Sequence, residues 1–361
     1  MTETLAETLP EDLRAWLAAS ADGIDQGRVP AAEILPRLAA AGLPRRGVPE
    51  ALGGTGGDAT DAMAAVIAVA EESLAAAFML WGHRCYAEFL VQTPNAALRE
   101  RQLPQIPAGA VAGASGLSNV MKFPAGLEPL QITARDEGDE LVLDGALPWV
   151  TNLRGAGFHV AAAADRAGGG PALIVALSSD DPGLVRSDDL ALIGMRSSDT
   201  AAIRLQGVRV PRDRILAANA QDWLPPVRPV FIAVQCGMAI GLARRALAEA
   251  EAAGGGGRAV LAGDIAATRA ALEAETRALF SGLRDGSFAA ACAPLFRLRI
   301  RLAQIVAEAT QLELQAGGGR CYLAGPGQGF ARRWREAAFI PVITPSIVQL
   351  RGALAAAAAA A

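Results

Sequence analysis

Apolar residues recur at helical spacing in the first and last thirds of the chain, and at strand-like spacing between them. In the middle, from about residue 111 to residue 216, short alternating runs are separated by turn residues, which is typical of β-strands. An order of helices, strands and helices differs from the strand–helix alternation of a doubly wound sheet and predicts an α+β fold. The helical spacing predicts helices over residues 11–21, 31–41, 61–89, 231–252, 265–283, 289–315 and 334–338.

Two glycine-rich segments interrupt the helical regions. The run Gly254–Gly257 predicts a flexible break between helices, because glycine has a high conformational entropy cost in a regular element. The glycines of segment 43–58 formally fit the spacing of a dinucleotide-binding loop, but no β-branched strand precedes them. We therefore interpret this segment as a turn in which Asp58 or Thr60 caps the following helix.

Length and composition indicate a soluble protein of two or three modules. The chain has 361 residues, 52% of them hydrophobic, but no uninterrupted apolar run of about 18 residues. Its start, MTETLAETLPEDLRAW, lacks the basic and apolar regions of a secretory signal, so we expect a cytoplasmic protein without a membrane partner. With a net charge of -4 and scattered basic residues, nucleic acid is not an expected partner either.

Cysteine and histidine are too sparse for a metal site or a disulfide framework. The four cysteines are far apart, without a C-x-x-C pair, which fits reduced and mostly buried thiols. The only two histidines are His83 and His159, so we predict no metal site.

Three segments carry candidate chemistry. Trp149 and Thr151 share one side of a predicted strand, where an indole and a hydroxyl suit a flat heterocycle, although a core tryptophan is the common alternative. The polar loop 194–200 is a candidate ligand contact or a solvated turn. The glycines of segment 315–319 end a predicted helix and allow a phosphate to approach, or form a simple C-cap.

Five collinear segments resemble motifs of the acyl-CoA dehydrogenase family, over about residues 42–351. VPEALGGTGGD resembles the family's VPEEYGGxGGD turn, and LDGALPWVTN resembles its xxGxKxWITN string. GMRSSDTAAIRLQGVRVP is similar to GxRxSxTxxxxFxxVxVP, QAGGGRCY is similar to QxxGGxGY, and Arg335, Glu336 and Ala337 fall on the family's RDA. One such match would be weak, but five in one order are specific.

This resemblance implies an N-terminal helical domain (1–108), a middle β-barrel-like domain (109–221) and a C-terminal four-helix bundle (222–361). It also implies an acyl-CoA substrate, a homodimer or homotetramer, and bound FAD, which the Gln315-x-x-Gly-Gly string favours over FMN. Trp149 and Thr151 would border the flavin ring, while the adenine and pyrophosphate would be approached across a subunit boundary. The cofactor-binding residues carried over from the motifs are Ser118, Trp149, Thr151, Arg258, Gln315, Gly318 and Gly319.

The resemblance fails at the catalytic base. The family's α,β-dehydrogenation of an acyl thioester needs a carboxylate beside the α-carbon. Counting from the RDA match places Thr344 at the usual glutamate, and the alternative base position falls near Phe231, with no Asp or Glu between Trp223 and Leu247. The family's TEPxxGSD loop survives only as GASGLSNVMKF, and Leu261 replaces the phenylalanine of its R-x-x-F-G motif.

Three functions are compatible with this pattern. The first is an FAD-dependent oxidoreductase acting on CH–CH groups without the usual glutamate. The second is a flavin-dependent monooxygenase on the same fold, which needs no α-proton base and for which His83 is the candidate residue, unless His83 is simply satisfied by a backbone carbonyl. The third is a non-catalytic relative that serves as a binding or assembly subunit.

Overall fold

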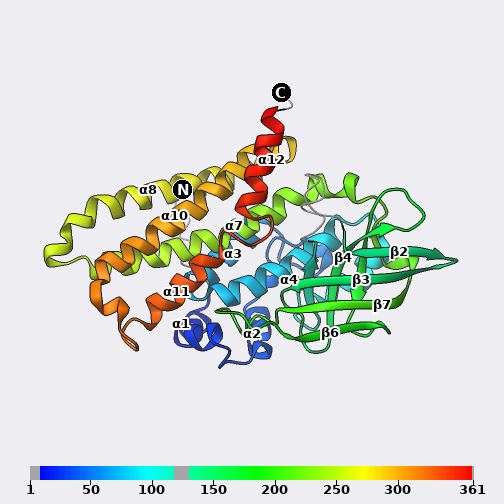
Figure 1. Cartoon of the computed structure of the whole chain (residues 1–361), viewed down its shortest axis with the longest axis horizontal. Coiled ribbons are helices and arrows are strands. Elements are labelled where there is room, and N and C mark those ends of the chain that lie inside the picture. The colour runs from blue at the N-terminus through cyan, green and yellow to red at the C-terminus, as the bar shows by residue number, and fades with distance from the viewer. Residues whose placement is uncertain (1–8, 118–129, 360–361) are drawn as a thin grey trace.

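The computed structural model describes residues 9–117 and 130–359, with helices gathered in one half of the molecule and strands in the other (Figure 1). Helices come first, strands follow, and long helices close the chain, which confirms the predicted α+β order. The first helices are α1 (Glu11–Asp25), α2 (Ile34–Ala40), α3 (Ala59–Glu72), α4 (Leu74–Gln92) and α5 (Ala96–Gln102). Short 3-10 turns at 31–33, 43–45, 50–52 and 103–105 connect or extend them.

The expected helix over residues 61–89 is in fact two helices, and that prediction was wrong. Ser73 adopts an extended backbone (φ -150°, ψ 114°) between α3 and α4, and its hydroxyl accepts the N–H of Ala76. A serine that caps the second helix offers the backbone an alternative to continuing the first. The predicted cap of α3 is confirmed, because Asp58 and Asp61 form a capping box there.

The strands form one eight-stranded sheet in the order β6-β7-β3-β2-β4-β5-β8, with β1 also paired to β4. Most pairs are antiparallel, whereas β4 runs parallel to both β1 and β2. Alternating burial along β7 shows which of its faces packs inward. The strands are β1 (Ala112–Gly116), β2 (Ile132–Glu137), β3 (Glu140–Val150), β4 (Phe158–Arg166), β5 (Leu173–Ser178), β6 (Leu184–Asp189), β7 (Ala201–Pro211) and β8 (Ile215–Ala217).

The long helices after the sheet start and stop differently from the prediction. Helix α7 begins at Ala220 rather than near Phe231 and continues through three prolines, since Trp223 packs against Phe89 and donates its indole N–H to the carbonyl of Gln92. An extended Ala291 divides the expected helix 289–315 into two. The helices are α7 (Ala220–Ala253), α8 (Ala262–Arg284), α9 (Ser287–Ala290), α10 (Cys292–Gly317), α11 (Gln328–Phe339) and α12 (Ile347–Ala359).

Helix α7 is the central helix of the helical half and packs against α3, α8 and α10. It is the one described helix long and apolar enough to span a membrane, but 83% of its most apolar window is buried inside the protein. Such burial is what a core helix of a bundle requires. As predicted, the chain leaves regular helix at the glycine run that follows Ala253.

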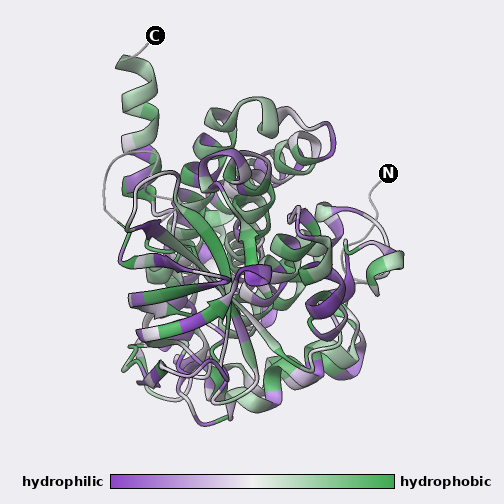
Figure 2. Ribbon diagram, turned by 90° about the vertical axis from the view of Figure 1, so that its right-hand side faces the viewer, coloured by the Kyte–Doolittle hydropathy of each residue, from purple (hydrophilic) through white to green (hydrophobic). Residues whose placement is uncertain are grey.

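The last helix, α12, projects from the body and is apolar along much of its length (Figure 2). Leu350 is its buried residue, while Val348 is 80% exposed.

Candidate functional site

A cavity of about 340 Å³ lies where the three parts of the chain meet. Helices α4, α7 and α11 and strands β1 and β3 all contribute lining residues. The segment after α11 completes the wall. The lining residues are Phe78, Trp81, Gly82, Ser115, Pro148, Trp149, Thr151, Phe231, Phe339, Val342, Ile343 and Thr344.

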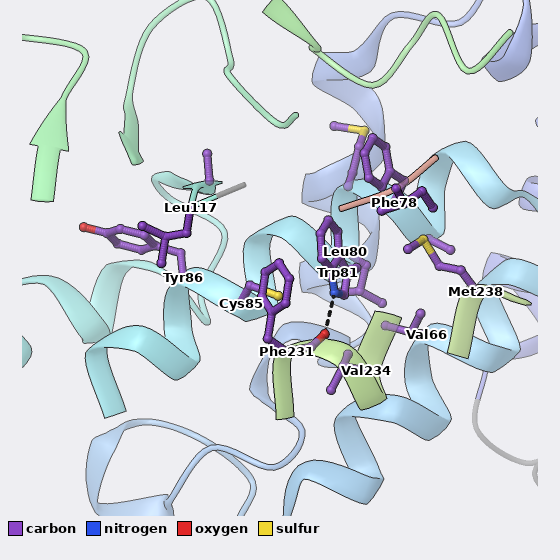
Figure 3. Close-up of a cluster of buried hydrophobic side chains, with 14 of the residues drawn as sticks. Val66, Phe78, Leu80, Trp81, Cys85, Tyr86, Leu117, Phe231, Val234 and Met238 are labelled. Carbon is purple, nitrogen blue, oxygen red and sulfur yellow. Dashed lines mark hydrogen bonds between the residues drawn. The ribbon is translucent and has the colours of Figure 1, made fainter. Parts of the chain in front are cut away.

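Aromatic rings from α4, α7 and α11 form one continuous part of the wall. Phe78 stacks on Trp81 with ring centroids 5.6 Å apart, and Trp81 lies 5.0 Å from Phe231. The indole N–H of Trp81 donates to the carbonyl oxygen of Phe231 at 3.3 Å, shown as the dashed line in Figure 3. Phe339 meets Phe78 edge-on at 5.1 Å. This hydrogen bond and these ring contacts fix the aromatic wall in one orientation.

The structure places Trp149 and Thr151 in the lining of the same cavity. Trp149 is 44% exposed, unusually open for an indole, and its ring lies 6.4 Å from that of Phe339. Thr151 is buried, and its hydroxyl is 2.6 Å from that of Thr200, which in turn is 2.7 Å from the hydroxyl of Ser198. The loop 194–200 therefore holds the Thr151 hydroxyl in position through Thr200 and Ser198.

Ser115 on β1 is a lining residue that the sequence did not single out. Its hydroxyl oxygen is buried and has no hydrogen-bond partner in the described structure. A buried hydroxyl without a partner is costly, so a ligand with a polar edge would stabilise it. The sequence signal was the degenerate loop GASGLSNVMKF, in which Ser118 was preferred; Ser118 lies outside the described residues.

The two positions considered for a catalytic base, Phe231 and Thr344, line this one cavity. Neither is ionisable, and no other described lining residue is a carboxylate, a histidine, a lysine or an arginine. Besides the indoles, the described lining side chains offer only hydroxyls as polar groups. These are the hydroxyls of Ser115, Thr151 and Thr344. The described lining residues therefore include no side chain that could act as a base for proton abstraction.

Two buried polar side chains hold the wall segment 340–344 from outside the cavity. Gln235 on α7 donates to the carbonyl of Thr344 at 2.8 Å. Its amide oxygen accepts the Nε–H of Arg299 at 2.9 Å, and the same guanidinium donates to the carbonyl of Ile340. Helices α7 and α10 are thus both tied to the backbone that carries Thr344.

The structure does not bring His83 into the cavity. Its side chain is fully buried, with Nε2 2.6 Å from the carbonyl of Ile106 and Nδ1 accepting the N–H of Gly113 at 2.9 Å. Burial lowers the pKa of His83 to about 4, so the ring is neutral at pH 7. This geometry is that of a histidine satisfied by backbone groups, the alternative that the sequence left open.

The residues predicted to contact the adenine and pyrophosphate of the cofactor are Arg258, Gln315, Gly318 and Gly319. They lie at or beside the C-terminal end of α10, and none of them lines the cavity. Gln315 is in the last turns of α10, and Gly318 follows with a left-handed φ of 57°. A Cβ on Gly318 would lie 2.9 Å from Arg258 Nη2, so the arginine and the glycine turn are adjacent. Close to them, Tyr322 is 91% exposed and Val260 is 82% exposed.

Comparison with known proteins agrees with this architecture. Residues 2–110 match the family model described as acyl-CoA dehydrogenase, N-terminal domain. The chain is 24% identical over 225 residues to the "Probable acyl-CoA dehydrogenase FadE25" of Mycobacterium tuberculosis, an alignment that covers 60% of this chain and 57% of that protein. Butyryl-CoA dehydrogenase from Megasphaera elsdenii has the same fold, with a TM-score of 0.85 at 21% identity over 98% of this chain and 97% of that one. The chain is acyl-CoA dehydrogenase-like.

The same fold also occurs in a protein solved with different ligands. A solved structure of KijD3, in complex with FMN and a dTDP-linked amino-keto sugar, superposes on this acyl-CoA dehydrogenase-like chain with a TM-score of 0.84 at 21% identity, over 100% of this chain and 95% of that one. The fold therefore does not identify the reaction, which has to be inferred from the residues that line the cavity.

Proposed function

We propose that this chain is a flavin-dependent oxidoreductase and that the cavity holds the flavin ring against Trp149 and Thr151. The observation that carries the proposal is the juxtaposition of a half-exposed indole, a positioned hydroxyl and the unpartnered hydroxyl of Ser115 in one cavity. A flat ring with polar edges matches all three groups. When bound, a flavin supplies hydride and electron transfer that no side chain here provides.

The residues of this chain would bind and orient the ring and keep water away from it. Trp149 offers an apolar face, while Thr151, held by Thr200 and Ser198, is positioned to hydrogen-bond a ring nitrogen or carbonyl. The apolar rings of Phe78, Trp81 and Phe231 would keep water out of the part of the cavity that they line. A dry cavity strengthens every polar contact made inside it.

The proposal extends to FAD and to a second copy of the chain. Gln315, Gly318, Gly319 and Arg258 lie together at the end of the bundle and would contact the adenine and pyrophosphate of a cofactor bound in a neighbouring subunit. The exposed side chains of Val260 and Tyr322 beside them support a covered surface there. Sedimentation with and without cofactor tests this part, and a monomer that binds FMN and FAD equally would contradict it.

The binding test is direct. The purified chain is titrated with FAD and with FMN, and the visible absorption and fluorescence of the flavin are followed. Trp149→Ala and Ser115→Val should weaken binding by about tenfold or more, in line with the loss of one stacking contact or one buried hydrogen bond. Trp334→Ala is the matched control, because Trp334 is 42% exposed but does not line the cavity. Absence of any flavin perturbation would reject the proposal.

The reaction class is tested by supplying the missing carboxylate. If the chain retains the geometry of a CH–CH dehydrogenase without its base, Thr344→Glu should accelerate reduction of the bound flavin by a short acyl-CoA by about 100-fold or more. Thr344→Gln, of the same size but without a carboxylate, is the control. Equal rates in all three proteins would mean that the acyl α-carbon does not lie beside residue 344.

A second candidate function, a flavin-dependent monooxygenase, is favoured by the lack of any ionisable side chain among the described lining residues. Such a reaction needs no α-proton base, although it can no longer be argued from His83. It predicts substrate-dependent oxygen uptake when reduced flavin is supplied. A flavin that binds but that no substrate reduces and that drives no oxygen uptake would instead favour the non-catalytic assembly role.

A further inference from the structure

Arg299 on α10 is a fully buried cation next to the cavity wall. Its residue surface is 1% exposed. It donates through Nε to Gln235 and through Nη2 to the carbonyl of Ile340, both neutral acceptors. Its third nitrogen, Nη1, is buried and has no partner among the described residues.

No anion balances this charge within the described structure. None of the ion pairs found within 4.0 Å in that part of the chain includes Arg299. The one titratable neighbour that influences it is Cys236, whose pKa burial raises to about 12, so its thiol is neutral at pH 7. Burial lowers the pKa of Arg299 itself, but a guanidinium starts high enough to keep its proton at neutral pH.

A buried charge without a counter-ion is unfavourable, and its field extends further in an apolar interior than in water. The cavity lies on the far side of the wall segment that Arg299 holds through Ile340 and, by way of Gln235, through Thr344, which lines the cavity. The described lining residues contribute no charge of their own. The positive electrostatic potential of Arg299 therefore acts on any ligand bound in the cavity.

We propose that Arg299 is a positioning residue that makes the cavity select a ligand that carries or develops negative charge. It acts through the wall segment 340–344, without touching the ligand. This inference extends the proposed function and rests on it for the identity of the ligand. The preference for an anion does not rest on it, since that preference follows from the residues of this chain.

Two matched fluorescent probes test the preference without any flavin. Anilinonaphthalene sulfonate is an anion, and N-phenylnaphthylamine is its uncharged counterpart of similar shape. Arg299→Met should weaken binding of the anion by about tenfold or more and leave the neutral probe within about twofold, because it removes one unit charge from a low-dielectric site. Arg299→Lys should retain the anion affinity. Arg301→Met changes an exposed arginine on the same helix and is the control for surface charge.

Gln235→Glu gives a second test in which the arginine remains. It is nearly isosteric and places a carboxylate where the amide oxygen now accepts from Arg299 at 2.9 Å, while it gives up the hydrogen bond from the amide N–H to the carbonyl of Thr344. The neutralised pair should lose the anion preference by a similar factor, even if Arg299→Met does not fold. Unchanged ratios of anion to neutral affinity in both Arg299→Met and Gln235→Glu would overturn the proposal.

With flavin bound, the midpoint potential provides a separate readout. Removing the charge should lower the potential, because the reduced and more negative form would lose its stabilisation. If the chain binds no flavin, the proposed function fails while the probe ratios still test Arg299. If flavin binds and neither the ratios nor the potential change, the inference fails and the proposed function stands.

Discussion

Buried arginines occur in two different settings in this protein. Around α11, each is neutralised: Arg332 lies 2.9 Å from the carboxylate of Glu336, and Arg333 pairs with Glu313. On the preceding helix, α10, Arg299 is equally buried but donates only to an amide and a backbone carbonyl. The ion pairs of α11 are complete without a ligand, whereas Arg299 has no charged partner in the part of the chain that the structure describes.

The difference separates residues that join the parts of the molecule from residues that serve the cavity. The neighbouring Arg335 donates to Asp25 on α1, and that carboxylate also accepts the backbone N–H of Met195 from the middle region. Glu336 likewise accepts the N–H of Leu74 at the start of α4. The charges of α11 thus hold the three parts together around the cavity, while the described residues that line the cavity carry no charge.

The largest loss of stability is expected where a buried ion pair is broken. Arg333→Met leaves Glu313 buried and unpaired, which should lower the free energy of unfolding by about 3–5 kcal/mol. Denaturant unfolding followed by circular dichroism measures this. Arg277→Met breaks an exposed pair with Glu273, so it should change the stability by less than about 0.5 kcal/mol. A loss in Arg333→Met no larger than in this control would show that the α11 pairs do not hold the fold.

The next effect concerns pH. The pKa of His83 is lowered to about 4 in the folded chain, whereas an unfolded histidine titrates near 6.5. The unfolded state therefore binds a proton first, and stability is lost as the pH falls from about 6.5 to about 4, by up to about 3 kcal/mol. The difference between the pH profiles of the native chain and His83→Gln isolates this loss. Parallel profiles would mean that the pKa of His83 is the same in the folded and unfolded states.

The smallest effect is expected where no counter-ion exists. Arg299→Met removes a buried charge with no carboxylate partner in the described structure and replaces it with an apolar side chain, so it should change the free energy of unfolding by no more than about 1–2 kcal/mol. Its loss should be clearly smaller than that of Arg333→Met in the same denaturant series. A loss as large as that of Arg333→Met would mean that the charge of Arg299 is compensated inside the folded chain.

Much of the fold and part of the site could be predicted from sequence because the signals are local. Strand alternation predicted that Trp149 and Thr151 share one side of a strand, although β3 ends at Val150 and Thr151 lies in the bend that follows. Motif spacing pointed to Phe231 and Thr344. The structure adds that all four line one cavity. The ends of some helices were predicted wrongly because tertiary packing overrides the local helix propensity, as at the prolines of α7.

Ser115 and Arg299 could not be found in the same way. Nothing in the sequence around either residue marks it as buried without a full set of partners, because that property depends on which elements surround it. The same holds for His83, whose two backbone partners come from a distant turn and from β1.

The sequence by itself determined the order of helices and strands, the resemblance to a known family and the lack of a carboxylate at both base positions, because these depend on residue type and spacing along the chain. The tertiary structure alone decided that α4, β1, β3, α7 and α11 close around one cavity, whose described lining residues are uncharged. It also decided that a single unbalanced cation lies behind the wall of that cavity among the residues described. Burial and charge balance arise only when distant segments remove each other from water.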